Sequence, residues 1–230
     1  PVGEGRHYSD LGFMLLGRIV KEQSGERLDA YVERALFEPM DLLNTGFMPS
    51  TRSGEPQFAS TSHGNPFERR MVHDPDFGYA IEGDADRWDS WRQYTFSGEV
   101  NDGNAHHAFQ GVAGHAGLFS TARELSTLLQ MLIDGGEHDG QRLVERATVD
   151  RFLTQEVDGQ ALGWQLPDYA PAGTFAHTGF TGTFVAALPH SGLTVVLLTN
   201  RQNVGVDEST NYTDVGPLQR AVIEAVTTHY

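Results

Sequence analysis

The sequence predicts an α+β fold, in which an antiparallel sheet is flanked by helices and joined to a helical and irregular region. Three observations lead to this prediction. Apolar residues recur at helical spacing near the start of the chain and again after residue 121. Residues 174–199 instead alternate with the period of two that is typical of strands. The elements follow the order helices, long loop, helices, three strands and a last helix, which favours a sheet covered by helices.

Two helices are expected at the start of the chain. The first should run from about residue 10 to residue 24, with Ser9 or Asp10 as its N-terminal cap and Gly25 at its end. The second begins near Leu28, carries apolar residues at i, i+3, i+4, i+7 and i+8, and is closed by Pro39. The apolar positions of the first helix are Leu11, Leu15, Leu16, Ile19 and Val20.

Residues 44–98 show no sustained period and are rich in Gly, Pro, Ser and Asp. We therefore expect an irregular excursion that extends over 44–110. A loop of this length in a compact domain is usually functional or mobile. Its aromatic residues fit a small satellite core as well as a lid or substrate wall. They are Phe77, Tyr79, Trp88, Trp91, Tyr94 and Phe96.

Regular structure is expected again after Gly111. The pattern from Thr121 to Glu124 is that of a capping box, and it predicts a helix that passes through Leu132 and ends at Gly135 and Gly136. The remaining elements are a helix over 145–154, strands over 174–180, 183–189 and 193–199, and a final helix that starts at Pro217.

The composition limits the classes of function. The chain has 230 residues, 39% of them hydrophobic, which suits one large domain or two small ones. Its net charge of −15, from 31 acidic and 16 basic residues, argues against nucleic-acid binding. Cysteine is absent, which excludes disulfides and thiolate chemistry. No apolar run approaches the ~20 residues of a transmembrane helix.

A strand that ends in small and hydroxyl residues is a candidate substrate site. His177-Thr178-Gly179 lies in the first expected strand, and Phe180 follows it. A substrate backbone can lie against such a strand as an additional strand, and Gly179 removes a side chain that would block the approach. Taken alone, the pattern fits a Thr/Gly-rich strand end with an exposed histidine equally well.

Two further segments have plain structural interpretations when each is taken alone. Tyr8-Ser9-Asp10 precedes the first helix, where a tyrosine usually packs and a serine or aspartate usually caps. The segment from Gly111 to Thr121 contains three glycines before a capped helix, so its backbone must turn tightly.

Taken together, the three segments resemble the family of class C serine β-lactamases, D-alanyl-D-alanine peptidases and related esterases. That family has a Tyr-x-Asn element before a helix, a Gly-Gly-Leu-x-Ser-Thr turn and a Lys-Thr-Gly or His-Thr-Gly strand, in this order. The sequence is most similar to the branch that contains penicillin-binding protein 4B. In that branch a Val-His-Asp-x-Asn-Ala stretch precedes Gly-Val-x-Gly-His-Ala-Gly-Leu-Phe-Ser, and here residues 100–105 and 111–120 match these two stretches.

The sequence departs from the family pattern at three points. Asp10 stands where many relatives have Asn, and Asn101 stands where the branch usually has His. The nucleophilic Ser-x-x-Lys motif is absent, because the only lysine is Lys21 and Arg18 stands three residues before it. The resemblance therefore implies that residues 1–230 are the C-terminal part of a single β-lactamase-like catalytic domain. The nucleophile and some strands of the sheet are expected upstream of this chain.

The resemblance also implies roles for individual residues. Tyr8, helped by the upstream lysine, would move the proton between the serine and the leaving group, beside Asp10. The Phe180 N–H would contribute to the oxyanion hole. His177 is also assigned to the catalytic group. The expected substrate-binding residues are Thr178, Gly179 and His115, and no cofactor or metal is implied.

Two alternatives to a serine acyl hydrolase remain at this point. The scaffold could bind a peptidoglycan-like peptide or a protein without catalysis. Histidines and aspartates could also hold a metal, although neither group has a strict ligand spacing. These groups are His73-Asp74-x-Asp76 and His106, His107 and His115. The sequence leaves open the acyl substrate, whether small or a peptidoglycan peptide, the oligomeric state, and a periplasmic, secreted or cytoplasmic location.

Overall fold

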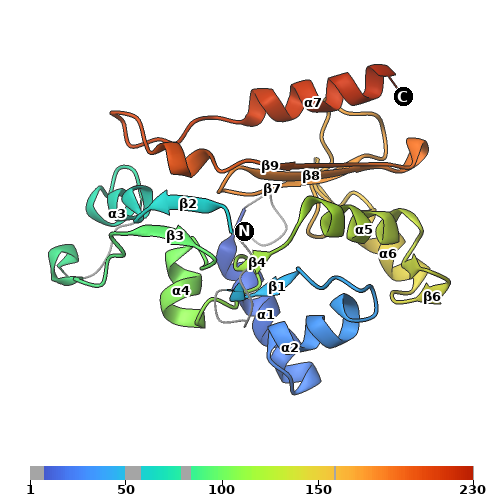
Figure 1. Ribbon diagram of the computed structural model, residues 1–230, viewed down its shortest axis with the longest axis horizontal. Coiled ribbons are helices and arrows are strands. Elements are labelled where there is room, and N and C mark those ends of the chain that lie inside the picture. The colour runs from blue at the N-terminus through green and yellow to red at the C-terminus, as the bar shows by residue number, and fades with distance from the viewer. Residues whose placement is uncertain (1–7, 50–57, 79–83, 158, 230) are drawn as a thin grey trace.

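The computed structural model describes residues 8–49, 58–78, 84–157 and 159–229. These residues form a three-stranded antiparallel sheet with helices on both faces, and a group of helices and two-stranded sheets beside it (Figure 1). The predicted α+β class is confirmed. No helix in the described ranges is both long and apolar enough to cross a membrane.

The main sheet has the strand order β7-β8-β9, and both pairs are antiparallel. The predicted strands are therefore confirmed, each within one or two residues of the expected ends. The strands are β7 (Phe175–Thr178), β8 (Thr183–Leu188) and β9 (Leu193–Leu198), and a 3₁₀ turn, η4 (Pro189–Ser191), joins the last two.

The alternation of side chains along β8 explains why helices cover both faces of this sheet. Phe184 and Ala186 pack against Ile223 of α7 (Gly216–His229), whereas Ala187 lies on the opposite face against Leu129 of α5 (Ala122–Ile133). Figure 1 shows α7 above the sheet, with α5 and α6 (Arg146–Leu153) below it. The sheet is thus held between two helical layers.

The N-terminus of α5 differs in one respect from the predicted capping box. The Thr121 hydroxyl accepts a hydrogen bond from the Glu124 N–H at 3.2 Å, as expected. The Glu124 carboxylate, however, accepts from the Asn44 backbone and side-chain amides and from the Thr45 hydroxyl. It therefore joins α5 to the segment before β1 (Gly46–Phe47), which pairs with β4 (Leu118–Phe119).

The first helix, α1 (Asp10–Ser24), has the predicted limits and caps. Ser9 caps its start and Gly25 ends it in the left-handed region at φ 75°. None of its residues is buried, although it carries an apolar stripe. The second predicted helix is present as α2 (Leu28–Val32), which continues into a π turn, η1 (Glu33–Phe37). The side chain of Phe37 reaches the core formed with Met131 of α5.

The expectation of an irregular excursion over 44–110 was wrong in part. Apart from β1, this range contains α3 (Pro66–His73), α4 (Gly103–Phe109), a short 3₁₀ turn η3 (Ala85–Arg87), and β2 (Ser60–His63) paired with β3 (Thr95–Ser97). Elements of three to eight residues are too short to establish a visible period in the sequence. The small hairpin β5 (Glu137–His138) and β6 (Gln141–Arg142) was missed for the same reason.

The aromatic residues of this range do not form one cluster. Phe96 is fully buried beside Tyr94, whereas Trp88 is 45% exposed and contacts His107. Phe77 packs on Phe67, Trp91 lies near His73, and Tyr79 lies outside the described residues. The range therefore contains several separate aromatic pairs in place of a single wall.

Candidate functional site

The end of β7 fixes the orientation of the His177 ring. His177 Nδ1 lies 2.8 Å from the Thr178 carbonyl oxygen. A carbonyl can only accept a hydrogen bond, so Nδ1 carries the proton and donates it. In the neutral ring, Nε2 is then the atom with the free lone pair. His177 can therefore accept a proton or, once protonated, present an N–H to an anion.

The outer edge of β7 is paired only in its first half. Ala176 exchanges two backbone hydrogen bonds of 2.8 Å with Gln165 on the side away from β8. Thr178 lies two residues further, so its N–H and C=O point to the same outer edge. Within the described ranges the recorded pairing on this edge ends at Ala176. An extended substrate therefore has an open edge beginning at Thr178.

The turn after β7 contains a peptide group, between Gly179 and Phe180, whose N–H has no acceptor among the residues that the structure describes. The Gly179 carbonyl accepts from the Gly182 N–H at 2.9 Å, and the Gly179 N–H donates to the Thr183 carbonyl at 2.7 Å. In a trans peptide the Phe180 N–H points opposite to the Gly179 carbonyl. No acceptor for the Phe180 N–H is recorded among the described residues. This N–H is thus a fixed and available donor at the strand end.

A contact with Thr183 explains the glycine at position 179, whereas the sequence analysis explained it by the approach of a substrate. A Cβ atom built on Gly179 would lie 2.1 Å from the Thr183 hydroxyl oxygen. Any other residue would therefore require the Thr183 hydroxyl to move, before a substrate is considered. Thr178 is held separately, because its hydroxyl accepts a hydrogen bond of 3.4 Å from the Gln165 side chain.

Tyr8 and Asp10 lie at the start of α1. Tyr8 is 70% exposed, and partial burial together with repulsion from Asp10 raises the pKa of its hydroxyl. Within the part of the chain that is described, the net influence on Tyr8 therefore opposes ionisation. A cation from elsewhere would be needed to make Tyr8 a base near neutral pH.

His115 lies in the glycine-rich turn, residues 111–121, which contacts α1. A Cβ atom on Gly114 would lie 2.1 Å from the Phe13 carbonyl oxygen, so the turn and the helix meet backbone to backbone. The His115 side chain is 4% exposed, and its Nε2 lies 2.9 Å from the Asp102 carboxylate. The hydrogen bond to Asp102 raises the pKa of His115, and the charge of Asp10 adds to this effect. His115 is thus held against Asp102, with its side chain closed to solvent.

Asp102 joins this turn to α4. Its carboxylate also accepts from the Ala105 N–H at 2.7 Å and caps the helix. Burial alone would raise the pKa of Asp102, but the hydrogen bonds from His115 and Ala105 lower it overall. The ion pair therefore favours a charged His115 and a charged Asp102.

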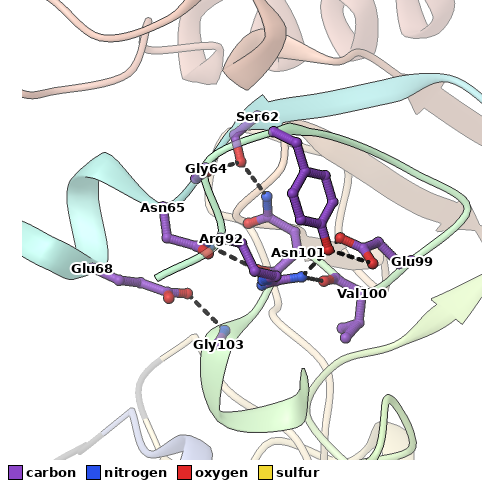
Figure 2. A network of polar contacts seen from close by, with 10 residues as sticks. Ser62, Gly64, Asn65, Glu68, Arg92, Glu99, Val100, Asn101 and Gly103 are labelled. Atoms are coloured by element: carbon purple, nitrogen blue, oxygen red, sulfur yellow. Dashed lines mark hydrogen bonds and ion pairs between the residues drawn. The ribbon is translucent and has the colours of Figure 1, made fainter. Parts of the chain in front are cut away.

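Figure 2 shows a polar network that the sequence analysis missed. The Arg92 side chain is 4% exposed and donates hydrogen bonds of 2.6 Å to the Val100 and Asn101 carbonyls. The Asn101 amide in turn donates to the Ser62 hydroxyl at 2.7 Å. Asn101, which replaces the histidine of the branch pattern, therefore has a structural partner here. An arginine among polar residues gives no sign in the sequence that it will be buried.

Glu68 of α3 is the most perturbed carboxylate of this network. It accepts a hydrogen bond from the Gly103 N–H at 2.9 Å, and burial raises its pKa to about 7. The neighbouring Phe67 contacts both Phe180 and Tyr212, with ring centroids 5.1 and 6.1 Å away. Through Phe67, α3 thus contacts Phe180, which follows the end of β7.

The candidate residues fall into two groups in the structure. His177, Thr178, Gly179 and Phe180 form one group at the end of β7. The other three, Tyr8, Asp10 and His115, are gathered where α1 meets the glycine-rich turn. No hydrogen bond or ion pair joins the two groups within the described part of the chain.

The metal alternative finds no site in the described ranges. No group of three histidine, aspartate or glutamate side chains there is placed to hold a metal ion. His106 and His107 contact each other edge to face at 4.7 Å, and His73 pairs with Asp86 at 3.2 Å.

Comparisons with known proteins agree with the fold and the motifs. The sequence profile of the family described as Beta-lactamase matches residues 1–217. The N-acetylmuramyl-L-alanine amidase of Bacillus subtilis (strain 168) is 32% identical over 86% of this chain and 45% of its own length. A putative D-alanyl-D-alanine carboxypeptidase of Escherichia coli (strain K12) is 32% identical over 84% of this chain and 44% of its own.

A solved structure shares the fold. The penicillin-binding protein homologue from Caulobacter crescentus superposes with a TM-score of 0.56 at 19% identity, over 88% of this chain and 55% of its own length. The chain spans less than half the length of the two curated relatives.

Proposed function

The chain belongs to the beta-lactamase family, and on this premise we propose that it supplies part of the active site of a serine acyl hydrolase. The observation that carries the proposal is the Phe180 N–H, a fixed donor without an acceptor among the described residues. It lies beside His177 and Thr178, where the open edge of β7 begins. An oxyanion hole needs a donor that is held in place before the reaction begins.

The nucleophile is proposed to lie on a Ser-x-x-Lys helix outside residues 1–230. The structure offers a surface of matching character on α1. An apolar groove of about 450 Å³ lies between α1, α2 and the glycine-rich turn, and Phe13 and Val20 contribute to its wall. Leu11 and Leu15 of the same helix are 69% and 64% exposed. An apolar helix packed here would cover this surface and bring its serine close to Tyr8.

In this proposal, each group has one chemical task. The serine oxygen attacks the substrate carbonyl, and the negative charge that develops on the carbonyl oxygen is stabilised by the Phe180 N–H and the serine's own N–H. The serine proton passes through Tyr8 to the leaving group. Tyr8 needs a nearby cation for this, because Asp10 and partial burial raise its pKa. The lysine of the proposed motif or a protonated His177 would supply the charge.

The proposed substrates are compounds with a reactive acyl group beside a carboxylate, such as D-alanyl peptides and β-lactams, or simple esters. A peptide fits the open edge of β7, because backbone hydrogen bonds to Thr178 would extend the sheet by one strand. The Thr178 hydroxyl and His177 Nε2 would then face the substrate carboxylate. The names of the amidase and carboxypeptidase relatives support a peptide substrate.

The test is covalent labelling with a fluorescent penicillin, followed by peptide mapping, together with turnover of a nitrophenyl ester. The protein expressed from its whole gene should take one label, on the serine of a Ser-x-x-Lys motif. The 230-residue chain alone should take none. Labelling of a serine within residues 1–230 would contradict the proposed location of the nucleophile. Stoichiometric reversible binding without label or turnover would instead support a non-catalytic binding protein.

A further inference from the structure

We propose that Arg201 and Gln202 are positioning residues that hold the Phe180 peptide in the geometry of the oxyanion hole. This inference rests on the proposed function. Both residues lie in η5 (Arg201–Val204), the 3₁₀ turn that follows β9. Neither belongs to the motifs that carry the resemblance to the family.

Both side chains bind the same carbonyl oxygen. Arg201 Nε donates to the Phe180 oxygen at 2.9 Å, and Gln202 Nε2 donates to it at 3.2 Å. Arg201 is fixed in turn, because its Nη1 donates to the Thr213 carbonyl at 3.1 Å. The two lone pairs of the Phe180 oxygen are therefore both used.

The two peptide groups that flank Phe180 are consequently both restrained. The preceding peptide is held at its Gly179 carbonyl by the Gly182 N–H. The following peptide is held at its Phe180 carbonyl by Arg201 and Gln202. The Phe180 N–H lies between these two anchors, so its direction is set without any bond to the N–H itself. A donor restrained in this way needs no reorganisation when the oxyanion forms.

The turn is also closed to larger side chains. A Cβ atom on Gly182 would lie 2.4 Å from the Thr199 hydroxyl and 3.0 Å from Arg201 Cγ. Thr199 itself donates to the Gly182 carbonyl at 2.7 Å. The contact between η5 and the 179–182 turn is therefore close at several points.

The burial of Gln202 separates positioning from substrate binding. Gln202 is 1% exposed, so it acts on the site only through Phe180. Arg201 is more accessible, and its guanidinium carbon lies 5.4 Å from the centre of the Phe180 ring. A direct ion pair between Arg201 and a substrate carboxylate is therefore the competing explanation, and it makes a different kinetic prediction.

The experiment compares Arg201→Ala, Arg201→Lys and Gln202→Met with the wild type, in the protein expressed from its whole gene. Each is assayed on a neutral nitrophenyl ester and on an anionic β-lactam. Arg220→Ala is the matched control. It removes the guanidinium of an arginine on α7 that lies 4.3 Å from the Tyr169 ring and has no recorded contact with Phe180 in the described part of the chain. Gln202→Met removes the buried donor at similar volume, so the test does not depend on one variant folding.

Removing one oxyanion-hole donor costs roughly 10²–10³-fold in kcat, so a donor that is only misdirected should cost about 10–100-fold. We expect this loss of kcat for Arg201→Ala and Gln202→Met on both substrates, with KM changed by less than about threefold. Arg201→Lys keeps one donor and should recover part of the loss. The control should be near wild type.

Three outcomes would overturn the inference. Unchanged kcat in Arg201→Ala and Gln202→Met would show that the Phe180 peptide needs no such support. A rise of KM confined to the anionic β-lactam and to the Arg201 variants would make Arg201 a carboxylate ligand. A wild-type protein without labelling or turnover would refute the proposed function itself, and the inference with it.

Discussion

Replacing Glu68 with glutamine should change how the stability of the protein depends on pH. Burial raises the pKa of Glu68 from 4.5 to about 7, and the charge of Asp102 adds to the rise. The Gly103 N–H and the Arg92 guanidinium act in the opposite direction. Glutamine has nearly the same shape and can still accept the Gly103 hydrogen bond, but it carries no charge at any pH.

The sign and size of the effect follow from proton binding. Below pH 4.5 the carboxyl group of Glu68 is protonated in both the folded and the unfolded protein, so its burial as a charge does not lower the free energy of unfolding. Between pH 4.5 and 7 the unfolded chain releases its proton while the folded protein retains it, so stability falls as the pH rises. Above pH 7 both states are ionised and the full cost remains. Each pKa unit corresponds to about 1.4 kcal/mol, which sets an upper limit of roughly 3 kcal/mol.

Urea denaturation followed by tryptophan fluorescence, at several pH values from 4.5 to 8.5, measures this directly. Glu68→Gln should match the wild type near pH 4.5 and exceed it by up to about 3 kcal/mol above pH 7.5. Glu99→Gln is the control, since Glu99 lies 3.3 Å from the same Arg92 and its side chain is 26% exposed. It removes an ion pair with Arg92, so it should not make the protein more stable than the wild type. A Glu68→Gln variant that is less stable than wild type at pH 8 would show that Arg92 keeps the carboxylate ionised, and the reasoning would fail.

Three further changes test the site and its support. Tyr8→Phe should lower turnover by about 10²–10⁴-fold and stability by only about 1 kcal/mol; near-native turnover in an acylation-limited assay would leave Tyr8 a packing residue. Asp10→Asn removes a charge that raises the pKa of Tyr8, so the acidic limb of the kcat/KM profile should move to lower pH, and an upward shift would contradict this. Glu124→Ala leaves the Asn44 amides without their acceptor and should cost about 2–5 kcal/mol in thermal or urea unfolding. Glu137→Ala changes a side chain that is 46% exposed and should cost at most about 1 kcal/mol. Equal losses in the two variants would argue against the Glu124 network.

The elements that the sequence predicted well are those whose side chains repeat one pattern for several turns or a whole strand. In β8, Phe184, Ala186 and Leu188 face one helical layer while the residues between them face the other, so the period of two is complete. Ser9 and Gly25 bound α1 for local reasons, a side-chain cap and a left-handed residue. The excursion lacks such repeats, because its elements are short and are held by contacts between distant residues.

The candidate site shows the same division. The motifs located the strand end with His177, but they gave no sign of what holds it. The partners of Phe180 come from η5, about twenty residues later, and the reason for Gly179 proved to be Thr183 in its own turn. Burial, which raises the pKa of Glu68, depends on the three-dimensional packing, and no local pattern records it.

The two groups of candidate residues differ in how firmly they are held, and this difference bears on the mechanism. The two peptides that flank Phe180 are fixed by three hydrogen bonds from backbone and side chains, whereas Tyr8 is 70% exposed beside the start of a helix without a buried residue. A proton shuttle must be held within hydrogen-bond reach of its partners. The described contacts provide this precision for the Phe180 N–H, the proposed oxyanion donor, but not for Tyr8. In the proposed mechanism, the segment that carries the nucleophile must therefore also order Tyr8 and lower its pKa. Catalysis and the covering of the apolar surface of α1 would then both depend on the contact between that segment and α1.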